Sequence, residues 1–315
     1  MLLTAILFTL SSCDNSGQSV ETASVSSEEQ TAETASVSAE EQTTEIASVS
    51  VTEQTVETTD VSFEERTSET ETEQADYEYE YEYDDDLGGI IITAYIGSEK
   101  DVVVPEKIDG ENVVAIGNRA FWGCAELTSV IIPDSVKEII GEYTFSGCTG
   151  LKSVKISENV TELSWCMFVE CTELTSVNIP YGVTEIGGSA FKGCTKLTEI
   201  TIPDSVTYLG SSAFRECKSL ASVVIPNGIT EIYVNTFADC TGLKSVTIPD
   251  SVTNIERKAF IRCKELTSVT VPDSVTEIGN TAFRSCENIS LTYKDKTYTY
   301  DNIDDFYNAV NGGTN

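Results

Sequence analysis

The chain contains no histidine among its 315 residues. Without histidine, Ser-His and Cys-His catalytic pairs and histidine-ligated metal sites are all excluded. Basic residues are scarce as well: 19 Lys and Arg stand against 52 Asp and Glu, and the formal net charge is -33. Nucleic-acid binding requires clustered Lys and Arg, so that class of partner is excluded, and an anionic membrane surface would repel the chain.

The apolar run that opens the chain, Met1 to Leu10, is too short to span a bilayer, which takes about 20 residues. It is typical of the apolar core of a signal peptide. The run ends in Leu10-Ser11-Ser12-Cys13, which resembles the bacterial lipobox, whose Cys is diacylated and becomes the mature N-terminus. No Lys or Arg precedes the run, which departs from that pattern, and an ordinary signal peptide with an incidental Cys is the alternative. We expect lipidation at Cys13 and display on the bacterial cell surface.

Most of the excess charge lies between residues 14 and 86, where 23 Asp or Glu accompany a single base, Arg66. Low hydrophobicity combined with high net charge predicts disorder. We therefore interpret 14–86 as an acidic stalk, rich in Ser, Thr and Glu, that holds a folded domain away from the cell. The stalk has its own 12-residue repeat, whose copies begin at Glu21, Glu33, Glu45 and Glu57.

The stalk ends in the alternating run Tyr77 to Tyr83, which Asp84 to Asp86 follow. An alternation of period two allows a strand once its charges are neutralised. A cation-binding or partner-docking tail is another interpretation. The sequence alone favours a solvated acidic linker, so we place the start of the folded domain at Leu87.

A repeat of 23 residues dominates the rest of the chain. The first interval between repeated phenylalanines is 24 residues and the next six are 23, and the extra residue falls at Ile139-Ile140. Each Phe is followed three residues later by a Cys. The phenylalanines are Phe121, Phe145, Phe168, Phe191, Phe214, Phe237, Phe260 and Phe283, and the cysteines are Cys124, Cys148, Cys171, Cys194, Cys217, Cys240, Cys263 and Cys286.

The unit reads LxxVxIPxxVxxIGxxAFxxCxx. The VxI segment has the period of a strand with one buried face, and Pro stops that strand because it lacks an N–H. VxxI predicts a second short extended piece, and AFxxC predicts one helical or 3₁₀-like turn. No unit can bury its apolar side alone, so we expect the copies to stack and to form ladders of Val, Ile, Leu, Phe and Cys.

This unit resembles the BspA-like class of leucine-rich repeats of bacterial surface proteins, over about Gly88 to Tyr300. The resemblance implies a right-handed leucine-rich-repeat solenoid, mostly β with short helical turns, preceded by the disordered acidic segment. We expect about eight 23-residue units in 87–300, an N-terminal coil, and a capping hairpin over Leu291 to Tyr300. In 301–315 we expect a tail or a short amphipathic helix near Asn302 to Val310.

The cysteine ladder favours buried free thiols over disulfides. Neighbouring copies would lie about 4.8 Å apart with parallel side chains, whereas a disulfide needs converging Cβ atoms about 3.5–4.5 Å apart. Zinc needs close Cys pairs, which a 23-residue period does not supply. Cys166 and Cys171 form the one local pair, for which a bridge or a metal is the alternative.

Catalysis is not expected, and neither is a cofactor or a metal. The recurring aspartates are copies of one turn residue that follows Pro, where Asp bonds nearby backbone N–H groups. A calcium ladder at these positions is the alternative, although Tyr181 and Asn227 interrupt it. The aspartates are Asp134, Asp204, Asp250 and Asp273.

Candidate binding residues come from two sources. One is the outward row of the strands, which presents hydroxyl groups. The other is the set of aromatic residues that depart from the unit: Tyr181 replaces Asp, Tyr208 replaces Glu and Tyr233 replaces Gly. The alternatives are a plain soluble face, scattered surface tyrosines and a repacked core around Trp165. The candidate ligand-binding residues are Tyr181, Tyr208, Tyr233, Trp122, Ser176, Asn178, Glu199, Thr201, Ser222, Ser245 and Thr247.

The resemblance implies adhesion, because some BspA-like proteins bind host matrix proteins or other cells. We therefore expect a monomeric, non-catalytic adhesion protein on the bacterial surface, with a protein or glycan ligand and membrane contact through the lipid anchor only. Two other functions stay open: capture of a glycan such as mucin or plant polysaccharide, and a structural spacer in the envelope.

Overall fold

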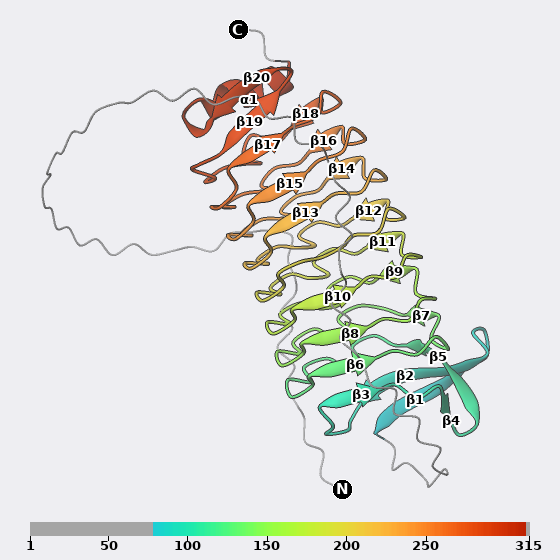
Figure 1. Ribbon diagram of the computed structural model, residues 1–315. Coiled ribbons are helices and arrows are strands. Elements are labelled where there is room, and N and C mark those ends of the chain that lie inside the picture. Colours follow the sequence, from blue (N-terminus) through green and yellow to red (C-terminus); the bar gives the residue numbers. More distant parts are fainter. Residues whose placement is uncertain (1–77, 313–315) are drawn as a thin grey trace, which may run out of the picture. The chain divides into compact units, whose positions relative to one another are not determined.

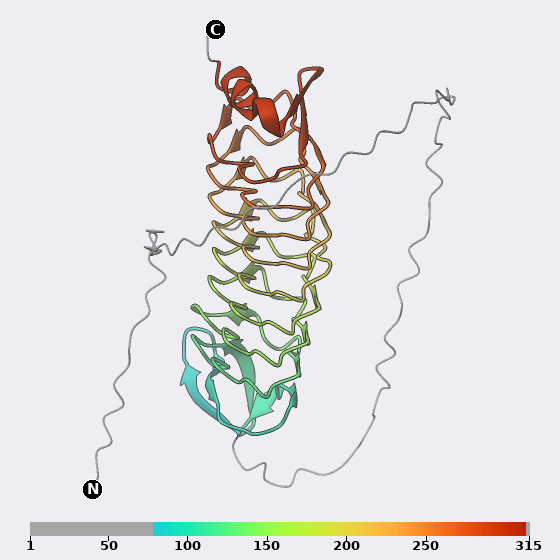
Figure 2. The same ribbon diagram turned by 90° about the vertical axis from the view of Figure 1, so that its left-hand side faces the viewer.

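Each sequence unit folds into one coil, and successive coils stack along a common axis, as Figures 1 and 2 show from two sides. This computed structural model describes residues 78–312. The predictions for the signal segment, for Cys13 and for the stalk up to residue 77 lie outside the described residues. The predicted solenoid is confirmed, and its short strands form two ladders that run side by side along the stack.

The first ladder consists of the VxI segments. Its strands pair in parallel and in register, and each buries its central residue: Val177 lies between the exposed Ser176 and Asn178. No strand forms at 199–201, and strand pairing is also interrupted between β15 and β17. The strands are β3 (Asp101–Val103), β6 (Ser129–Ile131), β8 (Ser153–Lys155), β10 (Ser176–Asn178), β13 (Ser222–Val224), β15 (Ser245–Thr247) and β17 (Ser268–Thr270).

The second ladder consists of short strands at the end of the VxxI segments, two residues long in every coil after β5. In most coils it places a glutamate outside and an apolar residue inside, as Glu185 and Ile186 show. The strands are β5 (Glu111–Ile116), β7 (Glu138–Ile139), β9 (Glu162–Leu163), β11 (Glu185–Ile186), β12 (Tyr208–Leu209), β14 (Glu231–Ile232), β16 (Asn254–Ile255) and β18 (Glu277–Ile278).

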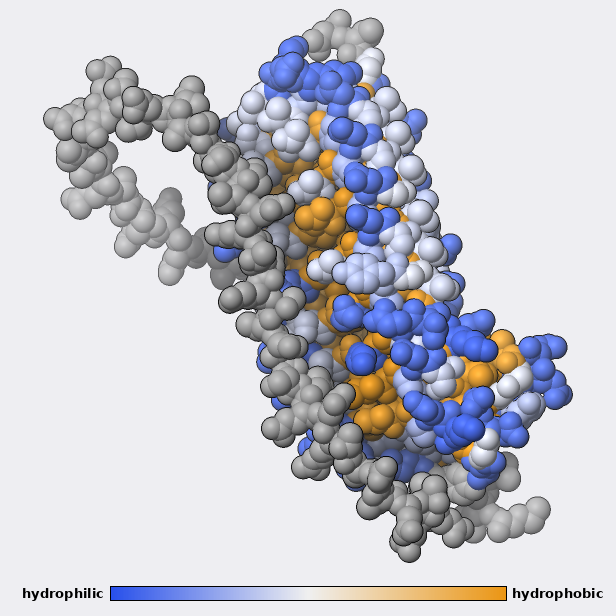
Figure 3. Space-filling view, turned by 45° about the vertical axis from the view of Figure 1, so that its right-hand side comes forward, coloured by the Kyte–Doolittle hydropathy of each residue, from blue (hydrophilic) through white to orange (hydrophobic). Residues whose placement is uncertain are grey.

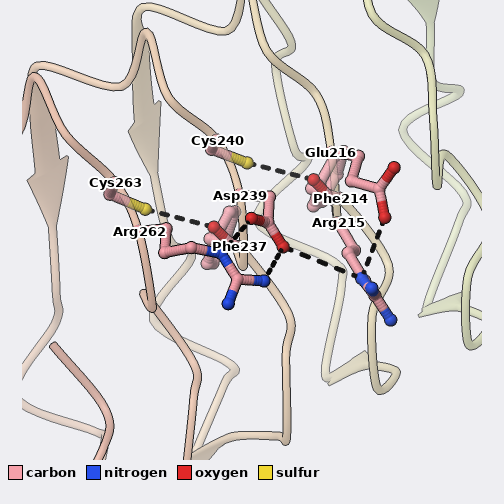
Figure 4. Close-up of polar contacts among 8 residues, drawn as sticks. All are labelled: Phe214, Arg215, Glu216, Phe237, Asp239, Cys240, Arg262 and Cys263. Carbon is pink, nitrogen blue, oxygen red and sulfur yellow. Dashed lines mark hydrogen bonds and ion pairs between the residues drawn. The ribbon is translucent and has the colours of Figure 1, made fainter. Parts of the chain in front are cut away.

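The core contains a continuous stack of phenylalanine rings, one from each coil. All eight are fully buried, and neighbouring ring centroids lie 5.0–5.5 Å apart. Beside them runs the expected ladder of free thiols. From Cys148 onward, each thiol of this ladder donates to the carbonyl of the Phe in the preceding coil, at 3.0–3.2 Å. Figure 4 shows two of these bonds, from Cys240 to Phe214 and from Cys263 to Phe237.

The turn around each Phe has the hydrogen bond of the predicted 3₁₀-like turn, but it does not continue as a helix. Arg215 N–H donates to the Ser212 carbonyl, three residues back, as in a 3₁₀ turn. Ser212 and Glu216, however, have φ of 61° and 65°, in the left-handed region, and such residues do not continue a right-handed helix. The N–H groups of Phe214 and Glu216 instead donate to carbonyl oxygens of the next coil. Successive backbone N–H groups of the turn therefore donate alternately to a carbonyl of the same coil and to a carbonyl of the next coil.

The N-terminal end is closed by strands that include the Tyr-Glu run. The predicted solvated linker is wrong from Tyr79 onward, because these residues form β1 (Tyr79–Asp84), antiparallel to β2 (Gly89–Tyr95). The ring of Tyr79 packs 5.4 Å from that of Tyr95 and 6.4 Å from that of Phe121, so the run covers the end of the aromatic stack. The folded domain therefore begins before Leu87. β2 pairs with β5 in parallel, and the remaining strand of this end, β4 (Lys107–Ile108), pairs with β5.

The C-terminal end has the predicted hairpin and helix. The hairpin consists of β19 (Ser290–Tyr293) and β20 (Lys296–Thr299), and a 3₁₀ turn, η1 (Tyr300–Asn302), leads into α1 (Ile303–Val310). α1 buries Phe306, Tyr307 and Val310, as its apolar periodicity predicted, and the Phe306 ring meets that of Phe283 edge-on at 6.2 Å.

This cap also satisfies the backbone groups that the last coil leaves open. The side-chain amide of Asn311 accepts from Ile278 N–H and donates to the Ile278 carbonyl, both at 2.9 Å, in place of another strand. The Tyr307 hydroxyl accepts from Phe283 N–H at 3.0 Å, in place of another Phe turn. Unpaired edges promote association between chains, so the cap keeps the stack from growing.

The Tyr307→Phe variant tests this role of the cap. Removal of the hydroxyl leaves the buried N–H of Phe283 without an acceptor, and an unpaired buried donor costs about 1–3 kcal/mol. We expect the free energy of unfolding, measured by urea titration, to fall by this amount. Tyr300→Phe is the matched control, since Tyr300 lies on the same cap. An equal loss in both variants would contradict the capping role of the Tyr307 hydroxyl.

Candidate functional site

The predicted hydroxyl face lies on the first ladder. The structure exposes all seven of its candidate side chains, but it divides them among separate strands. Glu199 and Thr201 occupy the coil that forms no strand, where the ladder is interrupted. The other five lie on three strands: Ser176 and Asn178 on β10, Ser222 on β13, and Ser245 and Thr247 on β15.

Tyr208 and Tyr233 come together on the second ladder, as their positions in successive units suggested. Tyr208 belongs to β12, Tyr233 directly follows β14, and their ring centroids lie 5.4 Å apart. Both rings are half-buried. Partial burial, together with the nearby carboxylate of Glu231, raises the pKa of both hydroxyls, and Glu185 adds to this effect at Tyr208. Both phenols are therefore neutral hydrogen-bond donors at physiological pH.

Tyr181 and Trp122 do not join this pair. Tyr181 follows Pro180 in the loop after β10 and is 83% exposed. Trp122 follows Phe121 in the first Phe turn and is 56% exposed. Among the described residues, no ring contact connects either side chain to Tyr208 or Tyr233. Of the three candidate tyrosines, two are in ring contact, and Tyr181 lies apart from them, as the alternative of scattered surface tyrosines has it.

A hollow that sequence reasoning missed lies at one of two breaks in the second ladder, the other being between β12 and β14. β7 pairs with β5, and β9 pairs with β11, but in residues 78–312 no strand pairing joins β7 to β9. The break coincides with the 24-residue unit: β7 ends at Ile139, and Ile140 is the extra residue before the chain turns. The extra residue is visible in the sequence, but which strands pair across coils is visible only in the structure.

The hollow has a volume of about 510 Å³ and is bounded by both interrupted strands. We call it the Trp165 pocket. Figure 3 shows a view of the molecule in which hydrophilic residues border exposed hydrophobic ones along the stack. Apolar atoms from Ile140, Val160 and Trp165 line the pocket together with charged and polar side chains, which are Lys137, Glu138, Glu142, Thr161, Glu162 and Ser164.

Trp165 is the main aromatic surface of the pocket. The sequence favoured a repacked core around it, but the side chain is 48% exposed. A Cβ on Gly188, in the next coil, would lie 2.9 Å from the indole ring, so the ring rests against backbone that only glycine leaves open. This packing holds the indole in place while leaving it accessible to a ligand.

Ser164, beside Trp165, has a hydroxyl without a partner. Its side chain is 6% exposed, and within the described residues its Oγ has no hydrogen-bond partner although it lines the pocket. Thr144 has a second such hydroxyl in the 24-residue unit, whereas its counterpart Thr236 in a regular coil bonds to the Tyr233 carbonyl. A buried hydroxyl is normally satisfied, so the Ser164 hydroxyl at the pocket wall is a polar group that the chain leaves unpaired.

The Phe turns carry a separate group of charges. Asp239 accepts a bidentate pair of hydrogen bonds from Arg262, with Nη2 to Oδ2 at 2.7 Å, and Arg215 lies between Glu216 and Asp239 (Figure 4). These charges neutralise one another and link adjacent coils. In the part of the chain that the structure describes, no cluster of three or more Cys, Asp or Glu is placed to hold a metal ion, and no helix has the length and apolarity needed to cross a bilayer.

The comparison with protein families gives one match. The model of the BspA-type leucine-rich repeat region matches in six copies, over 114–244, 166–290 and 234–309, which together cover more than half of the chain. No curated protein matches the chain.

Solved structures of bacterial leucine-rich repeat proteins are similar to this one. The T. pallidum protein is 33% identical with a TM-score of 0.58, over 62% of this chain and 91% of that one. A Bacteroides ovatus protein is 28% identical with a TM-score of 0.60, over 69% and 70%. A leucine-rich cell surface protein from Faecalibacterium prausnitzii is 35% identical with a TM-score of 0.51, and the match covers 73% of this chain but 56% of that protein.

The ladder of Phe and Cys, the two rows of short parallel strands and these matches lead to one conclusion: the chain belongs to the BspA-type leucine-rich repeat family.

Proposed function

We propose that this protein is a non-catalytic binding protein of the bacterial surface that adheres to a protein on a host, in a matrix or on a neighbouring cell. One observation carries the proposal: exposed or half-exposed aromatic rings gather along the second ladder among glutamates. Trp165 follows β9, Tyr208 lies in β12, and Tyr233 follows β14. Tryptophan and tyrosine are enriched in the few interface residues that supply most binding energy.

The rest of the chain supports this role. Caps close both ends of the stack, so the sides of the solenoid are left for a partner, and repeat proteins bind along such extended faces. The leucine-rich repeat proteins that resemble this chain, one of which is described as a cell surface protein, support protein binding at the cell exterior. Lipidation at Cys13 would tether the head through the acidic segment.

A panel of immobilised matrix proteins and polysaccharides tests the proposal. We expect saturable binding of the full-length protein to at least one matrix protein, and a weakening of about tenfold or more in a Tyr208→Ala, Tyr233→Ala double variant, because an aromatic anchor contributes about 2 kcal/mol or more. Tyr181→Ala is the matched control, since that exposed ring lies apart from the pair. Circular dichroism should show that both variants are folded.

Other outcomes would select other functions. Glycan capture is the second candidate, since the same aromatic pair could stack on sugar rings. It predicts that soluble sugars compete for binding, whereas protein adhesion survives them. Binding that is unaltered in the double variant would contradict the role of the pair and redirect attention to the hydroxyl face. The absence of any ligand across the panel would favour the envelope spacer.

A further inference from the structure

We propose that the Trp165 pocket binds an arginine side chain from a basic segment of the partner protein. This inference rests on the proposed function and names the chemistry of one contact within it. It begins with the position of the pocket. Strands β7 and β9 do not pair with each other, and the hollow lies between them, beside the extra residue of the 24-residue unit.

The charge around the pocket favours a cation. Three carboxylates line it, those of Glu138, Glu142 and Glu162, against the single ammonium group of Lys137. All four side chains are exposed, and among residues 78–312 no ion pair involves any of them. The net negative charge around the pocket attracts a cation. A neutral sugar would leave this charge unbalanced.

The indole of Trp165 favours the same kind of ligand. The face of a tryptophan ring attracts a cation within about 6 Å of its centre, and Arg stacks on such a face more often than Lys does. The ring borders the same hollow as the three carboxylates, so one planar guanidinium group can contact the ring and a carboxylate together. Lysine offers a point charge without this planar match.

The Ser164 hydroxyl supplies a third contact. It lines the pocket without a partner, and as a hydroxyl it can accept a hydrogen bond. A guanidinium group has five N–H donors in a fixed plane, which is enough for a carboxylate and a hydroxyl at once. The hollow of about 510 Å³ is in the usual range of ligand pockets, roughly 300–1,000 Å³, and has room for one such side chain.

The two tryptophans of the chain provide the test. In proton–nitrogen correlation spectra of the full-length protein, Trp122 and Trp165 each give one indole N–H signal, which a Trp165→Phe variant assigns. A capped Gly-Arg-Arg-Gly peptide is the probe, and the same peptide with citrulline, the uncharged isostere of arginine, is its control. We expect the arginine peptide to shift the Trp165 signal saturably, to leave the Trp122 signal in place, and to bind at least about tenfold more tightly than the citrulline peptide.

Variants locate the contact. Glu142→Gln with Glu162→Gln keeps the shape of the side chains and removes two charges, so binding of the arginine peptide should weaken about tenfold. Glu277→Gln is the matched control, because Glu277 has the same ladder position in β18, at the other end of the stack. Equal binding of both peptides, equal effects of the two kinds of variant, or a Trp165 signal that moves only with a neutral oligosaccharide would overturn the proposal.

This test is separable from the panel experiment. If the panel identifies a protein ligand whose affinity is unchanged in the Glu142→Gln, Glu162→Gln variant, and the arginine peptide does not bind, the proposed function stands and the arginine site is wrong. If the panel yields no ligand but the arginine peptide binds as expected, the pocket chemistry stands and the search moves to partners with basic segments.

Discussion

At pH 10 the protein is expected to unfold at a much lower urea concentration than at pH 7, with a loss of unfolding free energy on the order of 10 kcal/mol. The cause is the thiol ladder. Burial, together with the neighbouring thiols of the ladder, holds the pKa of each ladder thiol from Cys148 to Cys263 above its ordinary value. The six buried thiols are Cys148, Cys171, Cys194, Cys217, Cys240 and Cys263, and the half-buried Cys124 at the start of the ladder also has a raised pKa.

The sign follows from proton binding. An unfolded thiol has a pKa of about 8.5–9, so above that pH the unfolded chain loses protons that the folded chain keeps. Stability is therefore fully present below about pH 8.5 and falls as the pH rises toward the folded pKa. At pH 10 each thiol contributes a loss of about 1.5–2 kcal/mol, and six such losses are comparable to the whole stability of a typical domain, roughly 5–15 kcal/mol.

Urea titrations at both pH values, in the presence of a reductant, measure this loss. The Cys194→Ala, Cys217→Ala, Cys240→Ala variant removes three of these thiols, so its loss between pH 7 and pH 10 should be smaller than that of the parent by about 5 kcal/mol. The variant is also less stable at pH 7, because it loses three thiol contacts to Phe carbonyls, but that effect is the same at both pH values. A pH dependence that is identical in parent and variant would contradict the thiol mechanism.

The second large effect is expected from Phe214→Ala, which should lower the free energy of unfolding by about 3–5 kcal/mol. Phe214 is fully buried, and its ring lies 5.2 Å from that of Phe191 and 5.5 Å from that of Phe237. Truncation removes both ring contacts and leaves a cavity, because the coil on either side is held by cross-coil hydrogen bonds and cannot close over the gap.

Urea titration at pH 7 measures this change too. Phe214→Leu is the conservative comparison and should lose less than the alanine variant, since the cavity is smaller. Tyr181→Ala truncates an aromatic ring that is 83% exposed and should change stability by no more than about 0.5 kcal/mol. A loss below about 1 kcal/mol for Phe214→Ala would mean that the aromatic stack does not hold the coils together.

The period of the repeat was enough to predict the regular part of the fold. Phe and Cys at a constant interval require coils that place equal residues in register, and Pro after each VxI segment marks where a strand ends. The C-terminal cap was also readable. Alternating Thr and Tyr predicted a hairpin, and apolar residues spaced three and four apart, such as Phe306, Tyr307 and Val310, predicted the buried side of a helix.

Three features escaped prediction for separate physical reasons. Strand β1 is acidic, and its charge suggested disorder. It is ordered because Tyr79 packs against Phe121 at the end of the aromatic stack, a contact that the local sequence does not show. The Phe turns place residues such as Glu216 in the left-handed region, where the cross-coil hydrogen bonds outweigh the local preference of the residue. The Trp165 pocket lies between two strands that do not pair, and the spacing of the repeat does not predict pairing, since β12 and β14, in regular units, do not pair with each other either.

The opening between β7 and β9 has a consequence for how such a chain can diverge. Every coil contacts only the coils beside it, so the opening between β7 and β9 depends on its immediate neighbours alone. Duplication or loss of whole 23-residue units nearer the C-terminal cap would change the length of the stack and leave the pocket, with its carboxylates and its indole, as it is. Recognition and length could then evolve independently within one gene, the first by substitutions around the opening and the second by recombination between repeats.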